Sequence, residues 1–336
     1  MTDFWRTTPR TAVRASVLAL ALVLLVPPVT AGAQPVRKVP TIGYVGLPGD
    51  PSESRWQDGF ARGLQELGYV PGHTIIIEVR GYTTGDELRR ALDEFVRRKV
   101  DVIFVGQPFT ALAARRATRD IPIVCGSCGD PTENGLAVSL ASPGGNVTGL
   151  ASLSAELIGK RLELMKELFP GVSRHAVFVF PANPGMRATS RALDAAGRTL
   201  GLEIQRVEIR GTGDFESTFR AAARGGAGTV LLQDDPMLRS ASAQIAALAL
   251  KHRVPVSAGV VELAEAGALM AYGPDRIDLY RRAAAFVDRI LKGARPEDLP
   301  FEQATKLGLV LNLKTARALG VTIPPSFTLR ADRLIE

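Results

Sequence analysis

Short apolar runs alternate with amphipathic stretches along almost the whole chain. Residues 41–45 are mostly apolar and include three β-branched side chains, and residues 54–67 then repeat large apolar side chains at spacings of three and four. A run of the first kind is typical of a buried strand, and the second period is that of a helix packed on one face. Strands are therefore predicted at 41–45, 73–80, 100–105, 121–124, 175–180, 202–209, 229–232, 254–258 and 268–273, an extended segment at 300–311, and helices at 54–67, 84–96, 111–118, 132–140, 156–168, 189–200, 215–224, 240–252, 275–291 and 312–319.

This order of elements predicts the fold class. Strands that alternate with helices of this length indicate parallel sheets with helices on both faces. A Pro-Gly-Gly break at 143–145 separates two similar halves, and about 300 residues suit two domains better than one. We predict an α/β protein with two Rossmann-like lobes joined by a multi-crossover hinge. Lobe 1 is expected at 34–147 plus 273–300, and lobe 2 at 148–272 plus 301–336.

The first residues have the pattern of a secretory signal. Three arginines precede an apolar run at 15–26, which ends at Pro27-Pro28 and is followed by Ala31-Gly32-Ala33. Basic, apolar and small-residue regions in that order are typical of a cleavable signal peptide. The apolar run is shorter than the roughly 20 residues that span a bilayer, so a transmembrane anchor is the weaker alternative. We predict a signal peptide at 1–33 and an exported, periplasmic chain that begins at Gln34.

Charge and motifs exclude several classes of function. The formal charge is +7, of which the leader supplies a net +2, and the remaining +5 is spread along the chain. Nucleic-acid binding therefore has little support. The three histidines, His73, His175 and His252, lack ligand spacing, so we expect no metal site and no cofactor. Nucleophile-elbow, zinc-protease and phosphate-loop motifs do not occur in the sequence, which argues against an enzyme and against catalytic residues.

The only two cysteines form a Cys125-Gly-Ser-Cys128 motif after a predicted strand. Such a spacing near a βαβ unit raises the possibility of a redox motif. Here it does not begin a long helix that would lower a thiol pKa. A small local disulfide and two inert thiols remain the two ordinary alternatives for an exported protein.

Candidate ligand-binding residues follow the predicted strands. In open α/β sheets the ligand meets the loops at the carboxyl ends of the strands. Six such loops are expected to form the binding site, at 47–50, 106–110, 125–130, 183–186, 234–236 and 259–262. The candidates in them are Leu47, Gln107, Pro108, Phe109, Thr110, Gly126, Ser127, Asp130, Asn183, Asp235 and Gly259.

Two of these loops suggest how an amino acid would be held. The helix start at 107–110 has backbone N–H groups for a carboxylate, although it is also an ordinary helix start. Asp130 is the candidate partner for an ammonium group, and it equally suits a cap for the helix predicted at 132–140. Phe109 either stacks on a ligand or belongs to the core. Turn formation alone would explain Asn183 and the Asp234-Asp235-Pro236 segment, and the start of a helix would explain Glu262.

Long collinear segments resemble one known family. They include GFARGLQELGYVPG at 59–72, SPGGNVTGL at 142–150, GKRLELMKELFPG at 159–171 and most of 271–332. With them the chain resembles the substrate-binding proteins of ABC transporters, in the family that includes the TrpX-like tryptophan-binding proteins. The resemblance extends over 42–336 and implies the type I periplasmic-binding fold.

The resemblance also implies a function. It implies a monomeric receptor that closes on a small molecule, such as an amino acid, and delivers it to an ABC permease in the inner membrane. The alternatives are a periplasmic sensor for a membrane signalling partner and, with less support, an enzyme with its site in the cleft.

Overall fold

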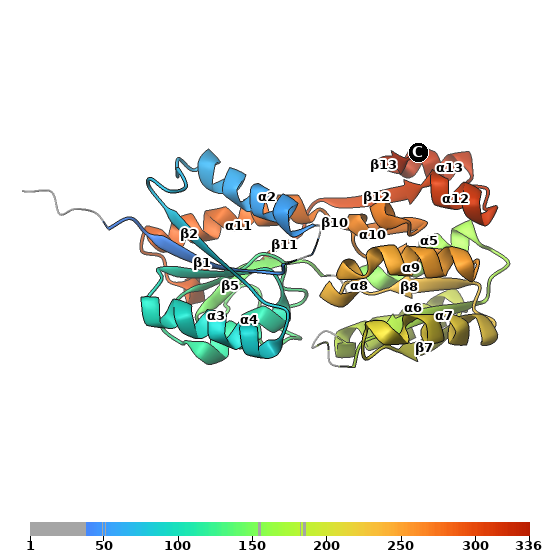
Figure 1. The fold of residues 1–336 in the computed structure, drawn as a ribbon, viewed down its shortest axis with the longest axis horizontal. Coiled ribbons are helices and arrows are strands. Elements are labelled where there is room, and N and C mark those ends of the chain that lie inside the picture. The colour runs from blue at the N-terminus through green and yellow to red at the C-terminus, as the bar shows by residue number, and fades with distance from the viewer. Residues whose placement is uncertain (1–37, 49, 51, 154–155, 182, 184–185) are drawn as a thin grey trace, which may run out of the picture. The chain divides into compact units, whose positions relative to one another are not determined.

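The computed structural model describes residues 38–48, 50, 52–153, 156–181, 183 and 186–336. The predicted signal peptide and its cleavage site lie outside these residues. The described elements form two sheets with helices on both faces of each (Figure 1). The α/β class predicted from the sequence is confirmed.

The first sheet contains parallel strands in the order β11-β5-β4-β3-β1-β2. Helices α2 (Glu53–Glu66) and α11 (Arg276–Leu291) pack on one face, and α3 (Gly85–Arg98) and α4 (Pro108–Ala117) cover the other. The strands are β1 (Thr41–Gly46), β2 (Ile76–Gly81), β3 (Val102–Val105), β4 (Ile123–Cys125), β5 (Val147–Ala151) and β11 (Glu302–Gln303).

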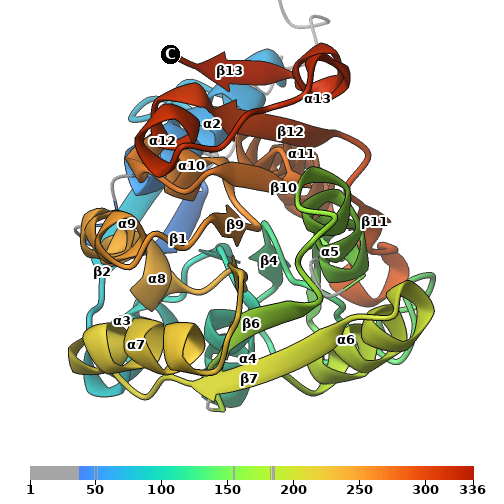
Figure 2. The same cartoon turned by 90° about the vertical axis from the view of Figure 1, so that its right-hand side faces the viewer.

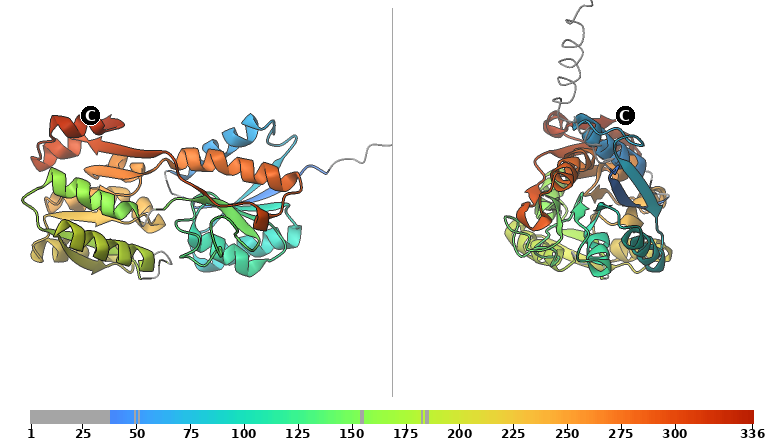
Figure 3. Two further views of the ribbon diagram at one scale, coloured as in Figure 1. Left: turned by 180° about the vertical axis from the view of Figure 1, so that it is seen from behind. Right: turned by 90° about the vertical axis from the view of Figure 1, so that its left-hand side faces the viewer.

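Close packing of α2 against α11 brings a distant part of the chain to this sheet. A Cβ atom on Gly63 of α2 would lie 2.1 Å from the carbonyl oxygen of Arg281 in α11, so only glycine allows the two backbones to approach this closely. In the view from behind, the orange α11 lies along the first sheet although it follows a strand of the second (Figure 3). The start of α11 at Arg276 thereby comes close to the loops that follow β1 and β3.

The second sheet has the order β13-β12-β10-β9-β8-β6-β7, and β12 is antiparallel to β10. Helices α7 and α9 lie on one face and α5 and α6 on the other (Figure 2). The strands are β6 (Arg174–Val179), β7 (Glu203–Glu208), β8 (Thr229–Leu232), β9 (Val256–Ala258), β10 (Met270–Pro274), β12 (Leu307–Asn312) and β13 (Arg333–Ile335). The helices are α5 (Leu157–Leu168), α6 (Met186–Leu200), α7 (Phe215–Arg224), α8 (Pro236–Ser240), α9 (Ser242–Lys251), α10 (Val261–Ala266), α12 (Leu313–Leu319) and α13 (Pro325–Arg330), with short 3-10 turns at Thr212–Asp214 and Pro296–Asp298.

One predicted helix was wrong. Residues 132–140 form consecutive turns and bends instead of a helix. Gly135 has a φ of +68°, which turns the chain out of the helical path after a single turn. The helix predicted at 240–252 occurs as α9, and the short helix α8 that precedes it was not predicted.

The strand pairing bears on where the chain passes between the sheets. Strand β5 (147–151) pairs with β4, and β11 (302–303) pairs with β5, so both belong to the first sheet. The chain therefore leaves the first sheet after Ala151 and again after Gln303. The lobe boundaries at 147 and 300 stay a prediction from the sequence. These strand pairings would move both boundaries by a few residues.

Candidate functional site

A cavity of about 920 Å³ lies between loops of the two sheets. It is lined by residues that follow β1, β2 and β3 of the first sheet and β6, β7 and β8 of the second. These are the carboxyl ends of parallel strands, where open α/β sheets place their ligands. Apart from three prolines, the apolar side chains of its lining are Leu47, Tyr82, Leu88, Phe109, Phe180, Ile209 and Met237.

Two aromatic rings form one wall of this cavity. Tyr82 and Phe109 meet edge to face, with ring centroids 5.8 Å apart. Tyr82 is buried, and desolvation raises the pKa of its hydroxyl, so the phenol is neutral at physiological pH. Edge-to-face geometry is one of the arrangements that aromatic pairs prefer, so the two rings support each other in this wall.

Asn183 and Asp235 form the polar part of the opposite wall. The Asn183 Nδ2 atom donates to Asp235 Oδ2 at 3.1 Å, and Asp235 Oδ1 accepts from the Met237 N–H at 2.9 Å. Asp235 thus caps the five-residue helix α8. Burial raises the pKa of its carboxyl group, which the bonds from Met237 and Asn183 partly offset.

A second, polar hollow of about 60 Å³ adjoins the cavity, and we call it the polar chamber. The two hollows share Phe109 and Asn183 in their linings. The chamber is lined from the first sheet by the start of α4 and the β4–β5 connection, and from the second by the ends of β6 and β8. Its remaining lining is Gln107, Pro108, Ser127, Gly129, Asp130, Asn134, Ser152, Ala188, Thr189, Gln233, Asp234 and Arg276.

Asp130 is a cap in this structure. Its Oδ1 atom accepts from the Thr132 N–H at 2.8 Å, the Thr132 hydroxyl at 2.6 Å and the Glu133 N–H at 3.1 Å. It therefore fixes the turn that replaces the expected helix. Asp130 also lines the polar chamber, so the capping role and a ligand contact are compatible.

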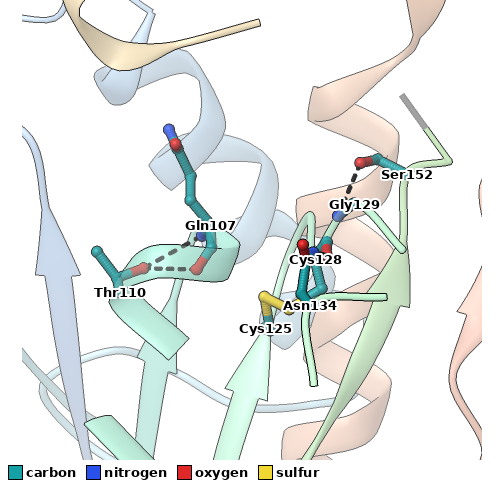
Figure 4. Close-up of a disulfide and its surroundings, with 7 residues drawn as sticks. All are labelled: Gln107, Thr110, Cys125, Cys128, Gly129, Asn134 and Ser152. Atoms are coloured by element: carbon teal, nitrogen blue, oxygen red, sulfur yellow. Dashed lines mark hydrogen bonds between the residues drawn. A yellow bond between two sulfur atoms is a disulfide. The ribbon is translucent and has the colours of Figure 1, made fainter. Parts of the chain in front are cut away.

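The start of α4 is held by its own residues. The Thr110 hydroxyl donates to the Gln107 carbonyl oxygen at 2.8 Å and accepts from the Gln107 N–H at 3.3 Å, and the Gln107 side chain points away from Thr110 (Figure 4). Thr110 is almost fully buried and lies outside the linings of both hollows.

Two of the candidate glycines are packing positions. A Cβ atom would lie 2.8 Å from Phe104 at Gly126 and 2.2 Å from the Arg161 guanidinium at Gly259. Both glycines lie outside the two linings, and their contacts with a ligand, like that of Thr110, stay a prediction.

Cys125 and Cys128 form a disulfide in the connection that leads to the chamber (Figure 4). Both residues are completely buried. The connection is further fixed by Asn134 Nδ2, which donates to the Cys128 carbonyl oxygen at 2.9 Å, and by the Gly129 N–H, which donates to Ser152 Oγ at 3.1 Å. Of the two ordinary alternatives left by the sequence, the disulfide is the one present.

Beside the chamber lies a buried group of charges that contacts both sheets' loops, which we call the Trp56 cluster. Arg239 binds Asp50 through Nε at 2.8 Å and Asp234 through Nη1 at 2.5 Å, and Arg276 pairs with the same Asp234. The guanidinium carbons of Arg239 and Arg276 both lie 4.9 Å from the centroid of the Trp56 ring, within the roughly 6 Å over which cation–π attraction acts.

The Trp56 indole N–H in turn donates to Glu262 at 3.0 Å. Glu262 lies in the first turn of α10, as the sequence suggested, and burial raises the pKa of its carboxyl group.

Residues 47–335 match the protein family described as ABC transporter substrate binding protein. The chain belongs to this family.

Two similar proteins are each 26% identical in sequence to this chain. A "Tyrosine-binding protein" of Clostridioides difficile (strain R20291) is 26% identical over 84% of this chain and 81% of its own. A conserved domain protein from Vibrio cholerae, also 26% identical, superposes with a TM-score of 0.84 over 88% of this chain and 100% of its own.

A third comparison bears on the fold. An ABC domain from Streptococcus pneumonia, solved in complex with L-Trp, is 23% identical and has a TM-score of 0.82 over 88% of this chain and 99% of its own. More distant solute-binding proteins and LacI-type regulators share the fold. The type I periplasmic-binding fold expected from the resemblance is confirmed.

In this substrate-binding protein, several residues of the two hollows were not among those expected. Gln233, Asp234 and Arg276 line the chamber, and Tyr82 and Met237 line the cavity. Trp56 was assigned only to a helix core. Asp234 directly precedes the candidate Asp235, and Arg276 falls at the start of the helix predicted at 275–291. The signal that existed for Arg276 was its place directly after the crossover strand β10, where the chain returns to the first sheet.

Proposed function

We propose that this protein is the extracytoplasmic solute receptor of an ABC uptake transporter and that its ligand is an amino acid with an aromatic or large apolar side chain. The observation that carries the proposal is the pairing of two unlike hollows. An apolar cavity with aromatic walls adjoins a small chamber lined by carboxylates, amides and a guanidinium. Such a pair fits a molecule with one apolar end and one compact charged end.

The relatives support the same class of ligand. One is named a tyrosine-binding protein and another was solved with L-Trp, and both amino acids combine an aromatic side chain with a zwitterionic head. Phe109, Tyr82 and Phe180 would contact the side chain, with Leu47 beside them. Asn183 and Asp235 lie at the boundary between the hollows, and Gln107, Pro108, Ser127 and Asp130 lie on the chamber side.

The proposal extends to location and partner. Within the described residues, none of the helices is both long enough and apolar enough to cross a membrane. Export by the signal peptide predicted at 1–33 would place the mature chain in the periplasm. The partner would be the permease of an ABC transporter, and the crossovers that follow β5, β10 and β11 would form the hinge on which the lobes close over the ligand.

Calorimetric titration of the mature protein tests the proposal. We expect saturable one-site binding of L-tyrosine or L-tryptophan and weaker binding of glycine and alanine, which leave the apolar cavity empty. Phe109→Ala should lower the affinity for the aromatic ligand about tenfold, because an aromatic pair of this kind contributes up to about 1.5 kcal/mol beyond its buried area.

Leu112→Ala is the matched control for that variant. Leu112 lies on the same helix and lines an adjoining groove between α3 and α4, which shares Phe109 with the cavity, but Leu112 itself is not part of the cavity lining. Its replacement should leave the affinity unchanged. If the protein binds sugars or polyamines but none of the amino acids, the proposed ligand class is wrong.

A further inference from the structure

Three buried side chains in the polar chamber have polar atoms without a hydrogen-bond partner in the described part of the chain. They are Ser127 Oγ, Gln233 Oε1, and the Nε and Nη1 atoms of Arg276. Each residue is more than nine-tenths buried and lines the chamber. Buried polar groups in folded proteins are almost always hydrogen-bonded, so four such atoms around one small hollow indicate that something polar occupies it.

These side chains come from three separate parts of the fold. Ser127 lies within the Cys125–Cys128 disulfide loop, Gln233 follows β8, and Arg276 is the first residue of α11. The disulfide and the packing of α11 against α2 fix two of them in place independently of each other. The chamber is therefore a built site, formed by residues that local chain geometry alone would not bring together.

The chamber is lined by groups of opposite charge. Arg276 shares its acidic partner Asp234 with Arg239, so its positive charge is only partly matched by that carboxylate. Asp130 uses Oδ1 for its cap bonds, which leaves Oδ2 for a second partner. The chamber thus presents donors at Arg276 and Ser127, and acceptors at Asp130 and Gln233.

We infer that this chamber binds the zwitterionic head group of the ligand, with the α-carboxylate on Arg276 and Ser127 and the α-ammonium on Asp130 and Gln233. The inference rests on the proposed function, and it moves the carboxylate from the start of α4 to Arg276. At the α4 start Pro108 has no N–H to donate, and the Gln107 N–H already donates to the Thr110 hydroxyl. Arg276, by contrast, has two N–H-bearing nitrogens to offer a charge-assisted bond.

The sizes of the hollows agree with this pose. A volume of about 60 Å³ accommodates about two water molecules, or the two small charged groups of one amino acid in their place. The shared lining at Phe109 and Asn183 then marks the place where the side chain of the ligand would enter the larger cavity.

The test compares an amino acid with its carboxamide, in which the carboxylate charge is removed. Titrations with L-tyrosine or L-tryptophan, whichever binds the wild-type protein more tightly, and with the corresponding amide are repeated on Arg276→Gln. We expect wild type to prefer the acid strongly and Arg276→Gln to lose roughly thirtyfold or more in affinity for the acid. Its affinity for the amide should change little, so the preference for the acid disappears.

Two comparisons keep a structural effect apart from a contact with the ligand. If Arg276 only holds the Trp56 cluster together, Arg276→Gln weakens acid and amide by the same factor and the preference survives, which overturns the inference. Arg281→Gln, on the solvent-exposed side of the same helix and also in an ion pair, should leave both affinities unchanged. Circular dichroism of each variant confirms that it is folded.

The remaining outcomes separate the inference from the function beneath it. If wild type binds the amino acid and Arg276→Gln binds it equally well, the carboxylate lies elsewhere and only the inference fails. If wild type binds none of the amino acids, the proposed function fails and the inference fails with it.

Discussion

Replacing Arg239 with methionine tests the energetic weight of the Trp56 cluster. The Arg239 side chain is 1% exposed and its two carboxylate partners, Asp50 and Asp234, are 0% and 10% exposed. Methionine keeps most of the apolar stem that covers the Trp56 ring but removes the charge. Asp234 would keep Arg276 as a partner, whereas in the described part of the chain the hydrogen bond left to the Asp50 carboxylate would be that from the Ser52 N–H, at 2.9 Å.

The expected loss follows from that uncompensated carboxylate. Removing one partner of a buried ion pair costs about 3–5 kcal/mol, because the surviving charge stays desolvated. Arg239→Met should lower the free energy of unfolding in urea by this amount. In a chain of this size the corresponding fall in melting temperature is roughly 5–8 °C. Asp50→Asn in the same background should recover most of the loss, since removal of both charges is close to neutral.

The matched control is Arg281→Met. Arg281 also binds two carboxylates, those of Glu66 and Asp278, but its side chain is 39% exposed. Exposed pairs contribute only about 0–1 kcal/mol, so this variant should unfold close to wild type. If Arg239→Met and Arg281→Met have the same stability, or if Asp50→Asn adds a further loss to Arg239→Met, the assignment of Asp50 as the stranded charge is refuted.

Three further predictions concern other positions. Asp130→Asn keeps the Oδ1 cap but removes the charge, so amino-acid affinity should fall about thirtyfold at unchanged stability. Asp130→Ala should in addition lower the free energy of unfolding by about 1 kcal/mol, because it removes the cap. Equal affinity of Asp130→Asn and wild type in titrations would show that Asp130 is a cap alone. Burial lowers the pKa of His175, so as pH falls the unfolded chain takes up a proton on this residue before the folded chain does. The free energy of unfolding should therefore decline as pH falls below about 6.5. Urea unfolding between pH 5 and 8 should show a shallower decline for His175→Gln than for wild type, and identical slopes would exclude this cause. The buried Cys125–Cys128 disulfide should show no insulin-reducing activity, and its replacement by two alanines should cost about 2 kcal/mol in urea unfolding; turnover of insulin would contradict the structural role.

The hydrophobic pattern was sufficient for most of the fold. Most of the predicted strands and helices occur within a few residues of their expected bounds, because each buried strand and amphipathic helix carries its period locally. The turns at 132–140 were missed because Asp130-Pro131 suits a helix start as well as a turn. The outcome there depends on the conformation of Gly135, which the residue type permits but does not require. The short helices α8, α10 and α13 have too few residues for a period to be detected.

Part of the candidate site could also be predicted. The rule that ligands bind at the carboxyl ends of strands led to loops that line the cavity, with Leu47, Phe109, Asn183 and Asp235 among them. Arg276 could not be found in this way, because it begins a helix that follows a strand of the second sheet and packs on the first. Its place beside Asp234 depends on a contact between residues 42 positions apart. Sequence patterns report local structure, whereas this pairing is set by tertiary packing.

A crystal structure of the mature protein grown with L-tyrosine or L-tryptophan tests the central claim most directly. The account predicts one bound amino acid with its ring in the cavity beside Phe109 and Tyr82 and its head group in the polar chamber, within hydrogen-bond distance of Arg276 and Asp130. An amino acid bound outside these two hollows, or a chamber that stays occupied by water alone at saturating ligand, would contradict it.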